Sequence, residues 1–188
     1  KMDNIAPGFG LKHESLNRTY FDINPKQNSP FAYFQYDYHP NEKINLIFGG
    51  RFDKFEEYKS QISPKFSGRY RIDDSNSLKL SLGYGFKAPD FRQLYFNFSN
   101  TSVGYSVIGY NVINSVINQL IEEGQIANII IPLSDFNTPL KPESSLSINI
   151  GYDRIFNDYI SIKSNLFVNS TKNLIDYRVI ANKTNGQN

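Results

Sequence analysis

Residues 78–86 read Leu-Lys-Leu-Ser-Leu-Gly-Tyr-Gly-Phe, a strict alternation of apolar and polar residues. A period of two places the apolar side chains on one face of a β-strand and the polar ones on the other. The same alternation recurs clearly at 62–72, 146–152 and 160–169 and with less purity at 32–38, 44–52 and 8–13. The sequence therefore predicts an all-β, antiparallel fold with about seven strands.

The connections between these strands alternate in length. Residues 39–42, 73–76 and 157–158 are short and rich in turn formers. Residues 15–29, 55–60 and 87–140 form longer connections, the last of which spans about fifty residues. Tight turns on one side and long loops on the other are typical of bacterial outer-membrane barrels, whose long loops are extracellular.

Aromatic residues gather near the short turns. They are Tyr36, Tyr38, Tyr70, Phe156 and Tyr159. In a membrane barrel such residues form a girdle at the lipid–water boundary, although Tyr is also common in strands generally. The polar faces carry Gly, Lys, Arg, Asn and Ser, as a hydrated lumen requires. A soluble β-sandwich, such as a surface adhesion module, also alternates, with its apolar face packed in a core, so that alternative stays open.

Composition restricts the chemistry. The net charge is +2, no block of like charge occurs, and there is no Cys and only His13 and His39. Nucleic-acid binding, thiol catalysis and Cys-based zinc sites have no basis here. Neither His has metal-ligand neighbours, and residues 73–76 lack the Gly and Glu of a calcium loop. We therefore expect no enzyme activity, catalytic residue, metal or cofactor.

The long connection contains a predicted helix. An apolar stripe with a period of 3.6 is followed by Gly124, a typical residue for a helix end. The stripe consists of Val112, Ile113, Val116, Ile117, Leu120 and Ile121. The helix and the apolar run after it either cover the pore mouth or simply pack on each other. Because binding residues favour loops on a rigid scaffold, the candidate ligand residues are Arg92, Tyr95, Tyr105 and Tyr110.

One stretch resembles a family signature. Residues 83–95 read Gly-Tyr-Gly-Phe-Lys-Ala-Pro-Asp-Phe-Arg-Gln-Leu-Tyr. This resembles the strand-end signature of TonB-dependent outer-membrane receptors, a Gly-Phe-Arg-Ala-Pro core that leads into an Arg–acidic–Leu phrase. The core is matched by Phe86, Lys87, Ala88 and Pro89. Lys87 replaces the usual Arg, and Gln93 replaces the frequent Glu.

Two further stretches follow in the order of that family. Leu140, Lys141, Pro142 and Glu143 are similar to its Asn-Leu-Lys-Pro-Glu, which opens the next strand, and residues 151–153 follow at the expected spacing. Residues 166–175 are similar to its aromatic strand and the Asp-Ile-Lys-Asp-Leu-Ile phrase that ends it. The three motifs together cover most of 78–179.

The resemblance implies that residues 1–188 are part of a single transmembrane β-barrel domain, in the C-terminal half of a receptor in a Gram-negative outer membrane. Such barrels have about 22 strands and a plugged lumen. No plug or terminal aromatic strand is visible here, so we expect a fragment, with its long extracellular loop at about 87–140.

The resemblance also implies active transport. Loops would capture a scarce metal chelate, such as a ferric siderophore, heme or cobalamin, and TonB would open the plug to let it pass. The partners implied are outer-membrane lipid, TonB through the plug, and the chelate. Uptake of an oligosaccharide or peptide with a surface-lipoprotein lid is the alternative.

Local chemistry adds three expectations at the signature. Pro89 has no backbone donor and biases Ala88 away from helix, so the strand should end there. Gly83 and Gly85 either leave room on the lumen face or relieve crowding at a bulge. Lys87, Arg92 and Glu143 flank the long connection and are candidates for ion pairing where the strands emerge.

Overall fold

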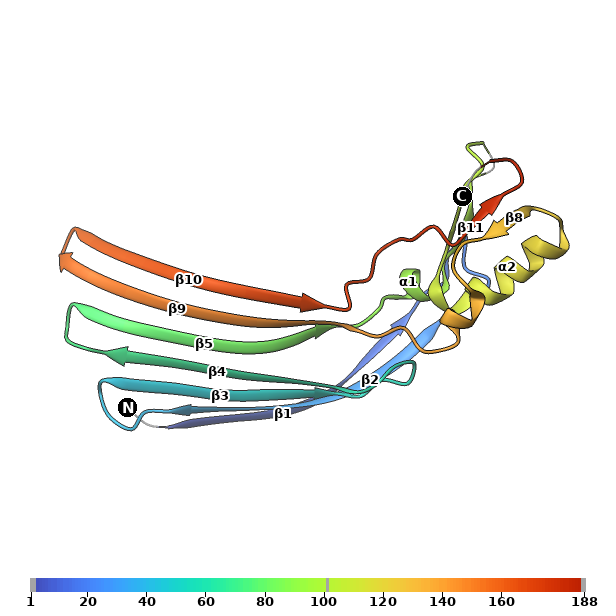
Figure 1. Ribbon diagram of the computed structural model, residues 1–188. Helices are drawn as coiled ribbons and strands as arrows, with labels where there is room; N and C mark the ends of the chain where they lie inside the picture. The colour runs from blue at the N-terminus through green and yellow to red at the C-terminus, as the bar shows by residue number, and fades with distance from the viewer. Residues whose placement is uncertain (1–2, 101, 187–188) are drawn as a thin grey trace.

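The computed structural model describes residues 3–100 and 102–186. Its main feature is one seven-stranded sheet in which every strand is antiparallel to its neighbours (Figure 1). In sheet order the strands are β1 (Asn4–Ser15), β2 (Lys26–Tyr38), β3 (Ile44–Asp53), β4 (Gln61–Arg71), β5 (Asn76–Lys87), β9 (Glu143–Asn157) and β10 (Ile160–Lys172). The predicted number of strands and their antiparallel order are confirmed.

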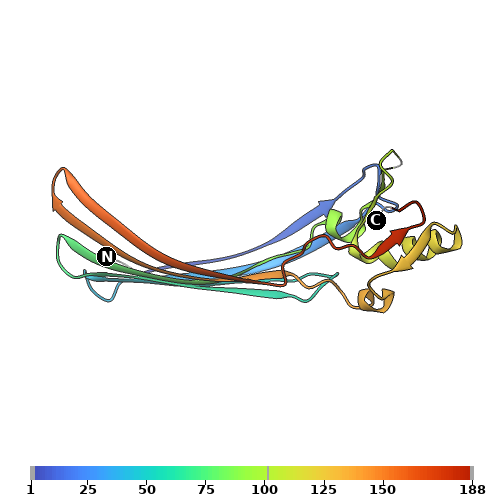
Figure 2. The ribbon, with the colours of Figure 1, turned by 45° about the horizontal axis from the view of Figure 1, so that its top comes forward.

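The sorting of the connections by length is also confirmed. The turns β2–β3, β4–β5 and β9–β10 lie together at one end of the sheet, and the long connections lie at the other end (Figure 1). The sheet curves along its length but does not close, so β1 and β10 are its two edges (Figure 2).

The first hairpin is longer than the sequence suggested. The first strand runs over Asn4–Ser15 rather than 8–13, and the first long connection shrinks from 15–29 to 16–25. Polar residues hide the strand period there, yet they pair across the hairpin. The His13 Nδ1 lies 2.8 Å from Asn28 Oδ1 across the hairpin, and Lys12 forms an ion pair at 2.8 Å with Glu14 on the same strand. Cross-strand pairs such as His13–Asn28 contribute to the stability of a β-hairpin.

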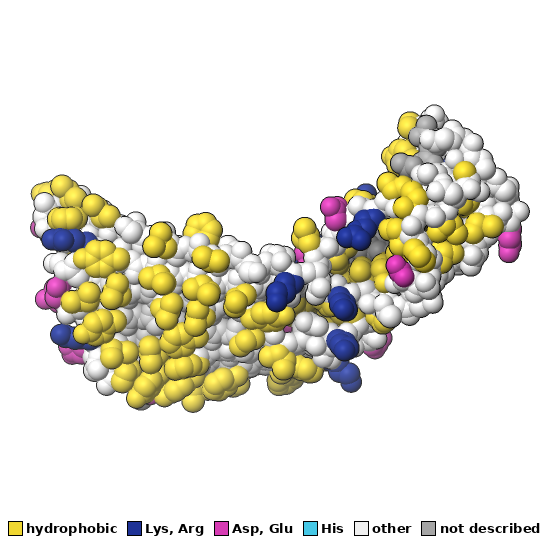
Figure 3. All heavy atoms as spheres, in the orientation of Figure 1, with side chains coloured by type: hydrophobic (Ala, Val, Ile, Leu, Met, Phe, Trp, Pro, Cys, Tyr) yellow, Lys and Arg dark blue, Asp and Glu magenta, His cyan; other side chains and the backbone are white. Residues whose placement is uncertain are grey.

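The apolar face of the sheet is uncovered. Leu78, Leu80 and Leu82 remain 42%, 37% and 37% exposed, and Ile150 is 54% exposed. The register pairs Leu80 with Ile150 and Leu82 with Ile148, so these side chains form a continuous band. Figure 3 shows the hydrophobic side chains spread over this face of the sheet.

No second layer packs on that band. In the described residues the only other sheets are the two-stranded pairs of the loop region, so a β-sandwich core is absent. An exposed apolar band on one face and polar side chains on the other is the arrangement of a membrane barrel wall. Four of the five aromatic residues expected near the turns are exposed there, with Tyr159 95% and Phe156 51% exposed, and Tyr36 is half-buried.

The loop region has its own small core. It comprises α1 (Phe91–Tyr95), β6 (Asn97–Ser99), β7 (Ser106–Ile108), η1 (Tyr110–Val112), α2 (Ile113–Glu122), β8 (Ile126–Ile129), η2 (Leu133–Phe136) and β11 (Ala181–Lys183). The predicted helix is confirmed as α2, and Gly124 ends it with a φ of +70°. Ile113 and Ile117 pack with Ala181, and Ile126 joins them. The helix and the apolar run therefore pack on each other.

No helix among the described residues is long and apolar enough to cross a membrane.

Candidate functional site

The signature residues build the junction between the sheet and the loops. β5 ends at Lys87, as Pro89 predicted, and Pro89 itself is buried. Asp90 then caps α1: its carboxylate accepts from the Gln93 backbone N–H at 2.8 Å, and the Gln93 side chain accepts from the Asp90 N–H at 3.0 Å. This is a reciprocal capping box. Gln93 supplies an amide oxygen where the family signature has a carboxylate.

The expected ion pair forms between two of its three candidates. Lys87 Nζ lies 3.3 Å from Glu143 Oε1, at the last residue of β5 and the first of β9. Glu143 is only 9% exposed and also accepts from the Ile175 backbone N–H at 3.1 Å. Arg92 takes no part, because its guanidinium lies over the Phe96 ring, 5.1 Å from the centroid. Of the other motif residues, Phe86 lies within β5, and Ala88, Leu140, Lys141 and Pro142 lie in the connection between β5 and β9.

The glycines of β5 open the polar face. The β5–β9 register runs unbroken from Asn76 to Lys87, so no bulge is present at Gly83 or Gly85. A Cβ added at Gly83 would meet nothing within 4 Å, and one at Gly85 would meet only Ser145 Oγ at 3.7 Å. A larger residue would fit at either position, so steric crowding is not the reason for these glycines. Their lack of side chains leaves this part of the polar face flat.

An aromatic cluster occupies the loop end of the molecule. The Phe96 and Phe98 rings stack at 5.9 Å, and the Tyr20 ring meets Phe98 edge-on at 4.9 Å. Tyr105 contacts Phe98 at 6.2 Å, and Phe21 contacts Phe96 at 5.6 Å. We call these five residues, Tyr20, Phe21, Phe96, Phe98 and Tyr105, the loop aromatic cluster. It joins the β1–β2 loop to the β5–β9 loop.

Tyr20 holds an unusual backbone conformation within this cluster. Its φ is +72°, in the left-handed region that a bulky residue rarely adopts. Asn97 fixes it on both sides, because the Asn97 N–H donates to Tyr20 O at 2.8 Å and the Asn97 amide donates to Asp22 at 2.8 Å. A strained backbone conformation of this kind is retained only where surrounding contacts hold it in place, and such positions are often ligand sites. The Tyr20 side chain remains 51% exposed.

The candidate ligand residues separate into two groups. Arg92 and Tyr105 lie at the loop aromatic cluster, one over Phe96 and the other against Phe98, and both are exposed. Tyr110 packs in the small core of the loop region, where it meets Phe136 at 5.4 Å and donates to the Asp135 carbonyl at 3.2 Å.

Tyr95 is held among structural partners. Its hydroxyl hydrogen-bonds Asn111 and Glu57. Burial raises the pKa of this hydroxyl, and the Glu57 carboxylate raises it further. Tyr95 therefore connects the β3–β4 loop to α1.

Three residues of the loop aromatic cluster, Tyr20, Phe96 and Phe98, were not predicted from the sequence. For Phe96 and Phe98 the alternation Phe96-Asn97-Phe98 could have indicated a short strand with both rings on one face.

The loop aromatic cluster presents ring faces and one guanidinium to solvent. Aromatic rings and Arg bind planar and anionic groups by stacking and charge-assisted hydrogen bonds. In the described residues no group of three or more His, Cys, Asp or Glu is placed to hold a metal ion. Neither histidine is part of the cluster: His13 Nδ1 contacts Asn28, and His39 Nε2 lies 2.6 Å from the Asn45 amide. The arrangement is suited to binding a ligand.

A family model decides the assignment. The model for the TonB dependent receptor-like beta-barrel matches residues 3–188. The chain belongs to this family. It is therefore part of the β-barrel of a TonB-dependent receptor in a Gram-negative outer membrane. The apolar band faces lipid, the polar face lines the lumen, the turns lie at the periplasmic end and the long loops are extracellular. The family is one of transport receptors.

Individual relatives agree with the assignment. The chain is 32% identical over 108 residues to the iron-regulated outer membrane virulence protein from two strains of Vibrio cholerae serotype O1. That alignment covers 54% of this chain and 17% of each relative. The chain thus matches less than a fifth of the length of these curated relatives.

Two solved structures share the fold. The siderophore receptor PirA from Pseudomonas aeruginosa superposes with a TM-score of 0.65 at 16% identity, over 89% of this chain and 27% of that one. PirA from Acinetobacter baumannii superposes with a TM-score of 0.55 at 18% identity, over 78% of this chain and 18% of that one. At these identities the likeness concerns the fold.

Proposed function

We propose that the receptor containing this chain imports a ferric siderophore across the outer membrane, with energy supplied by TonB through a plug. The single observation that carries the proposal is the loop aromatic cluster with Arg92 above it. Its position on two extracellular loops that contact each other suits the first capture of a ligand from outside the cell. The names of the relatives, which refer to iron regulation and to siderophores, support the same class of cargo.

The cluster favours one kind of chelate. The ring centroids of Tyr20, Phe96 and Phe98 lie within 6.2 Å of one another. The Arg92 guanidinium adds a positive charge over Phe96. Aromatic stacking and a fixed cation together recognise an anionic ligand with aromatic groups. A ferric tris-catecholate has both properties, so we name it as the cargo to test first.

Binding of that chelate tests the proposal directly. Radioactive ferric tris-catecholate is titrated onto cells that express the intact receptor and lack other siderophore receptors. Arg92→Gln and Phe98→Leu are each expected to weaken binding about fivefold to tenfold, since one cation–π or stacking contact contributes about 1 kcal/mol. Transport should also require TonB, so deletion of TonB should leave binding intact and abolish uptake.

A matched control comes from the same end of the molecule. Arg178 and Tyr177 are exposed, belong to the segment that follows β10, and lie outside the cluster. Arg178→Gln and Tyr177→Leu should leave affinity unchanged. Equal losses in test and control variants, or the absence of saturable binding, would overturn the proposal. TonB-dependent uptake of an oligosaccharide or peptide, together with a co-purifying surface lipoprotein, would establish the alternative instead.

A further inference from the structure

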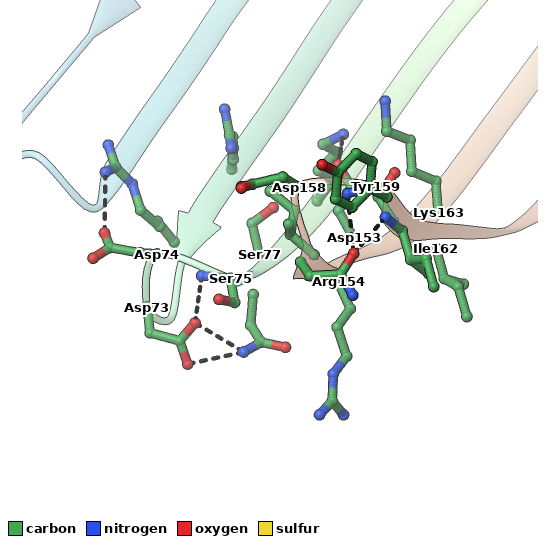
Figure 4. A pocket seen from close by; sticks show the side chains of 18 residues that line it. Asp73, Asp74, Ser75, Ser77, Asp153, Arg154, Asp158, Tyr159, Ile162 and Lys163 are labelled. Atoms are coloured by element: carbon green, nitrogen blue, oxygen red, sulfur yellow. Dashed lines mark hydrogen bonds and ion pairs between the residues drawn. The ribbon is translucent and has the colours of Figure 1, made fainter.

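A hollow of about 640 Å³ lies at the periplasmic end of the sheet, between the β4–β5 turn and the β9–β10 turn (Figure 4). Asp73, Asp74, Asp153 and Asp158 line it together with five basic side chains. Because these charges nearly balance, the hollow favours neither anions nor cations. The loop end of the molecule carries a more specific arrangement.

The β6–β7 hairpin at the loop end has two chemically different faces. Its register places Phe98 opposite Val107 and Ser99 opposite Ser106. Neighbouring residues of a strand point to opposite faces, so the Phe98 ring and the Ser99 hydroxyl lie on opposite sides of the hairpin. Tyr105 packs against Phe98. One face therefore carries rings of the loop aromatic cluster, and the other, which we call the serine face, carries the Ser99 and Ser106 hydroxyls.

The serine face is held by a side chain from a different segment. The Lys183 ammonium donates to Ser106 Oγ at 2.7 Å and to the Gly104 carbonyl at 3.2 Å. Because an ammonium group only donates, Ser106 Oγ is the acceptor in this contact. Ser106 Oγ also lies 2.7 Å from Ser99 Oγ. One chain of hydrogen bonds therefore runs from Lys183 across both strands of the hairpin.

Lys183 itself extends from an anchored backbone. It belongs to β11, which pairs with β8, and the N–H of the next residue, Thr184, donates to the Gln125 carbonyl at 2.9 Å. Two residues earlier, Ala181 is 6% exposed and packs with Ile113 of α2. Figure 1 shows β11 beside β8 and α2. The ammonium is therefore fixed relative to the small core of the loop region.

The hairpin lies between two other segments of the chain. On its aromatic face, Phe98 meets the Tyr20 ring of the β1–β2 loop at 4.9 Å. On its serine face, the contact is the Lys183 ammonium, and both of its acceptors are neutral oxygen atoms. Hydrogen bonds from a charged donor are stronger than those between neutral groups. Removal of the ammonium would therefore release the hairpin on the side away from the rings.

We propose that Lys183 is a positioning residue for the loop aromatic cluster: it holds the β6–β7 hairpin from the serine face, so that Phe98 and Tyr105 keep the arrangement that receives the ligand. The segment after β10 thereby takes part in ligand capture without touching the ligand. For the role in capture, this inference rests on the proposed function. The hold of Lys183 on the hairpin depends on no ligand and is testable separately.

The first experiment measures the hairpin without any ligand. Hydrogen exchange of the intact receptor in detergent is followed by mass spectrometry of peptides that cover residues 97–108. Lys183→Met keeps the length of the side chain and removes its donors, so exchange in the hairpin should become about tenfold faster or more. Lys183→Arg keeps a charged donor and should restore exchange to within about threefold of the parent. Unchanged exchange in Lys183→Met would overturn the inference.

A double-mutant cycle shows whether the effect runs through the serine face. Ser106→Ala removes the acceptor on the hairpin and should also accelerate its exchange. Combined with Lys183→Met, it should give a total acceleration smaller than the product of the two single effects, because both variants break the same hydrogen bond. A total equal to that product would show that Lys183 acts elsewhere, and the inference would be wrong.

Lys172 provides the matched control for the loss of a positive charge. It is exposed at the end of β10, outside the loop region. Lys172→Met should leave exchange at residues 97–108 within about twofold of the parent. Peptides from α2 should exchange at the parent rate in every variant. Acceleration of α2 equal to that of the hairpin would mean that Lys183→Met unfolds the small core, and Lys183 would then not be a positioning residue.

The second experiment measures ligand capture on cells that express the intact receptor. Lys183→Met should weaken binding of ferric tris-catecholate about fivefold, the effect of loosening one ring contact, and Lys183→Arg should restore it. The concentration for half-maximal uptake should rise by the same factor with the maximal rate unchanged, because Lys183 acts on capture alone. Parent-like affinity in a Lys183→Met receptor whose hairpin exchanges faster would overturn the inference. Absence of saturable binding by the parent would refute the proposed function instead, and the exchange results would stand.

Discussion

The ammonium nitrogen of Lys87 lies 3.3 Å from Glu143 Oε1, where the last residue of β5 meets the first residue of β9. The Lys87 side chain is 59% exposed, whereas the Glu143 side chain is 11% exposed. Glu143 also accepts the Ile175 N–H, so it connects β5, β9 and the segment after β10. The pair fixes the position at which the long extracellular loop leaves the barrel wall.

This asymmetry predicts unequal effects of mutation. Lys87→Met should lower the free energy of unfolding by at most about 1 kcal/mol, as for an exposed ion pair. Glu143→Ala should lower it by about 1–3 kcal/mol, because two donors lose their acceptor. Urea unfolding of the intact receptor in detergent, followed by its electrophoretic band shift, measures both. Equal losses would show that Ile175 contributes nothing to the junction.

The capping box of α1 gives a second prediction. Asp90→Ala removes the acceptor of the Gln93 N–H and should destabilise α1 by about 1 kcal/mol. Gln93→Glu keeps the acceptor for the Asp90 N–H and adds a negative charge to the first turn, so it should preserve or slightly stabilise the helix. Hydrogen exchange of the amides of residues 93–96 in the intact receptor measures the change. Faster exchange in Gln93→Glu than in Asp90→Ala would contradict this account.

The strands and α2 were predictable because each has a local period. The alternation at 78–86 and the 3.6-residue stripe at 112–121 can be read without knowledge of any partner strand. β1 was underestimated at its two ends, residues 4–7 and 14–15, which have no clear alternation of their own and belong to the strand because they pair with β2. The pairing of β8 with β11 had no local signal, since the two strands are about fifty residues apart in sequence.

The candidate site was predictable only in part. Arg92 and Tyr105 were proposed because they are loop residues of binding types, and the structure places both at the loop aromatic cluster. Tyr110 has the same local character, but it packs against Phe136. Tyr20 was missed because its role depends on a long-range contact with Phe96 and Phe98 and on a backbone conformation that its side chain disfavours. Whether these residues bind the cargo stays a prediction.

Asp73 in the β4–β5 turn predicts a dependence of stability on pH. Hydrogen bonds from the Asn76 side chain and the Ser75 N–H hold the pKa of Asp73 below its usual 3.8. A carboxyl with a lowered folded-state pKa stabilises the fold above its unfolded pKa. That contribution is lost as the pH falls through the folded-state pKa. Asp73→Ala should therefore lower the urea midpoint at neutral pH, and the difference from the parent should shrink as the pH falls below 3.8 and through the folded-state pKa.

A control separates this turn from general acid effects. Asp74 belongs to the same turn and is fully exposed, with only a 3.9 Å contact to Arg71. Asp74→Ala should change the midpoint little and with little dependence on pH. A difference for Asp73→Ala that stays constant from about pH 7 to about pH 2.5 would show that the carboxylate charge does not stabilise the turn.

Gly109 packs directly against the backbone of α1. A Cβ added there would lie 2.5 Å from Tyr95 N, 2.6 Å from Leu94 C and 2.6 Å from Phe96 N, and these backbone atoms cannot rotate away as a side chain can. The Gly109 N–H also donates to Phe96 O at 2.6 Å. Gly109→Ala should therefore separate η1 from α1 at a cost of about 1–3 kcal/mol. The backbone around Arg92 would loosen, so trypsin should cleave there faster on intact cells. Gly83→Ala, whose added methyl meets nothing, should leave cleavage unchanged. If Gly109→Ala resists trypsin as well as the parent does, the contact between η1 and α1 does not hold the loop, and the position of the loop aromatic cluster must depend on Tyr20, Asn97 and Lys183.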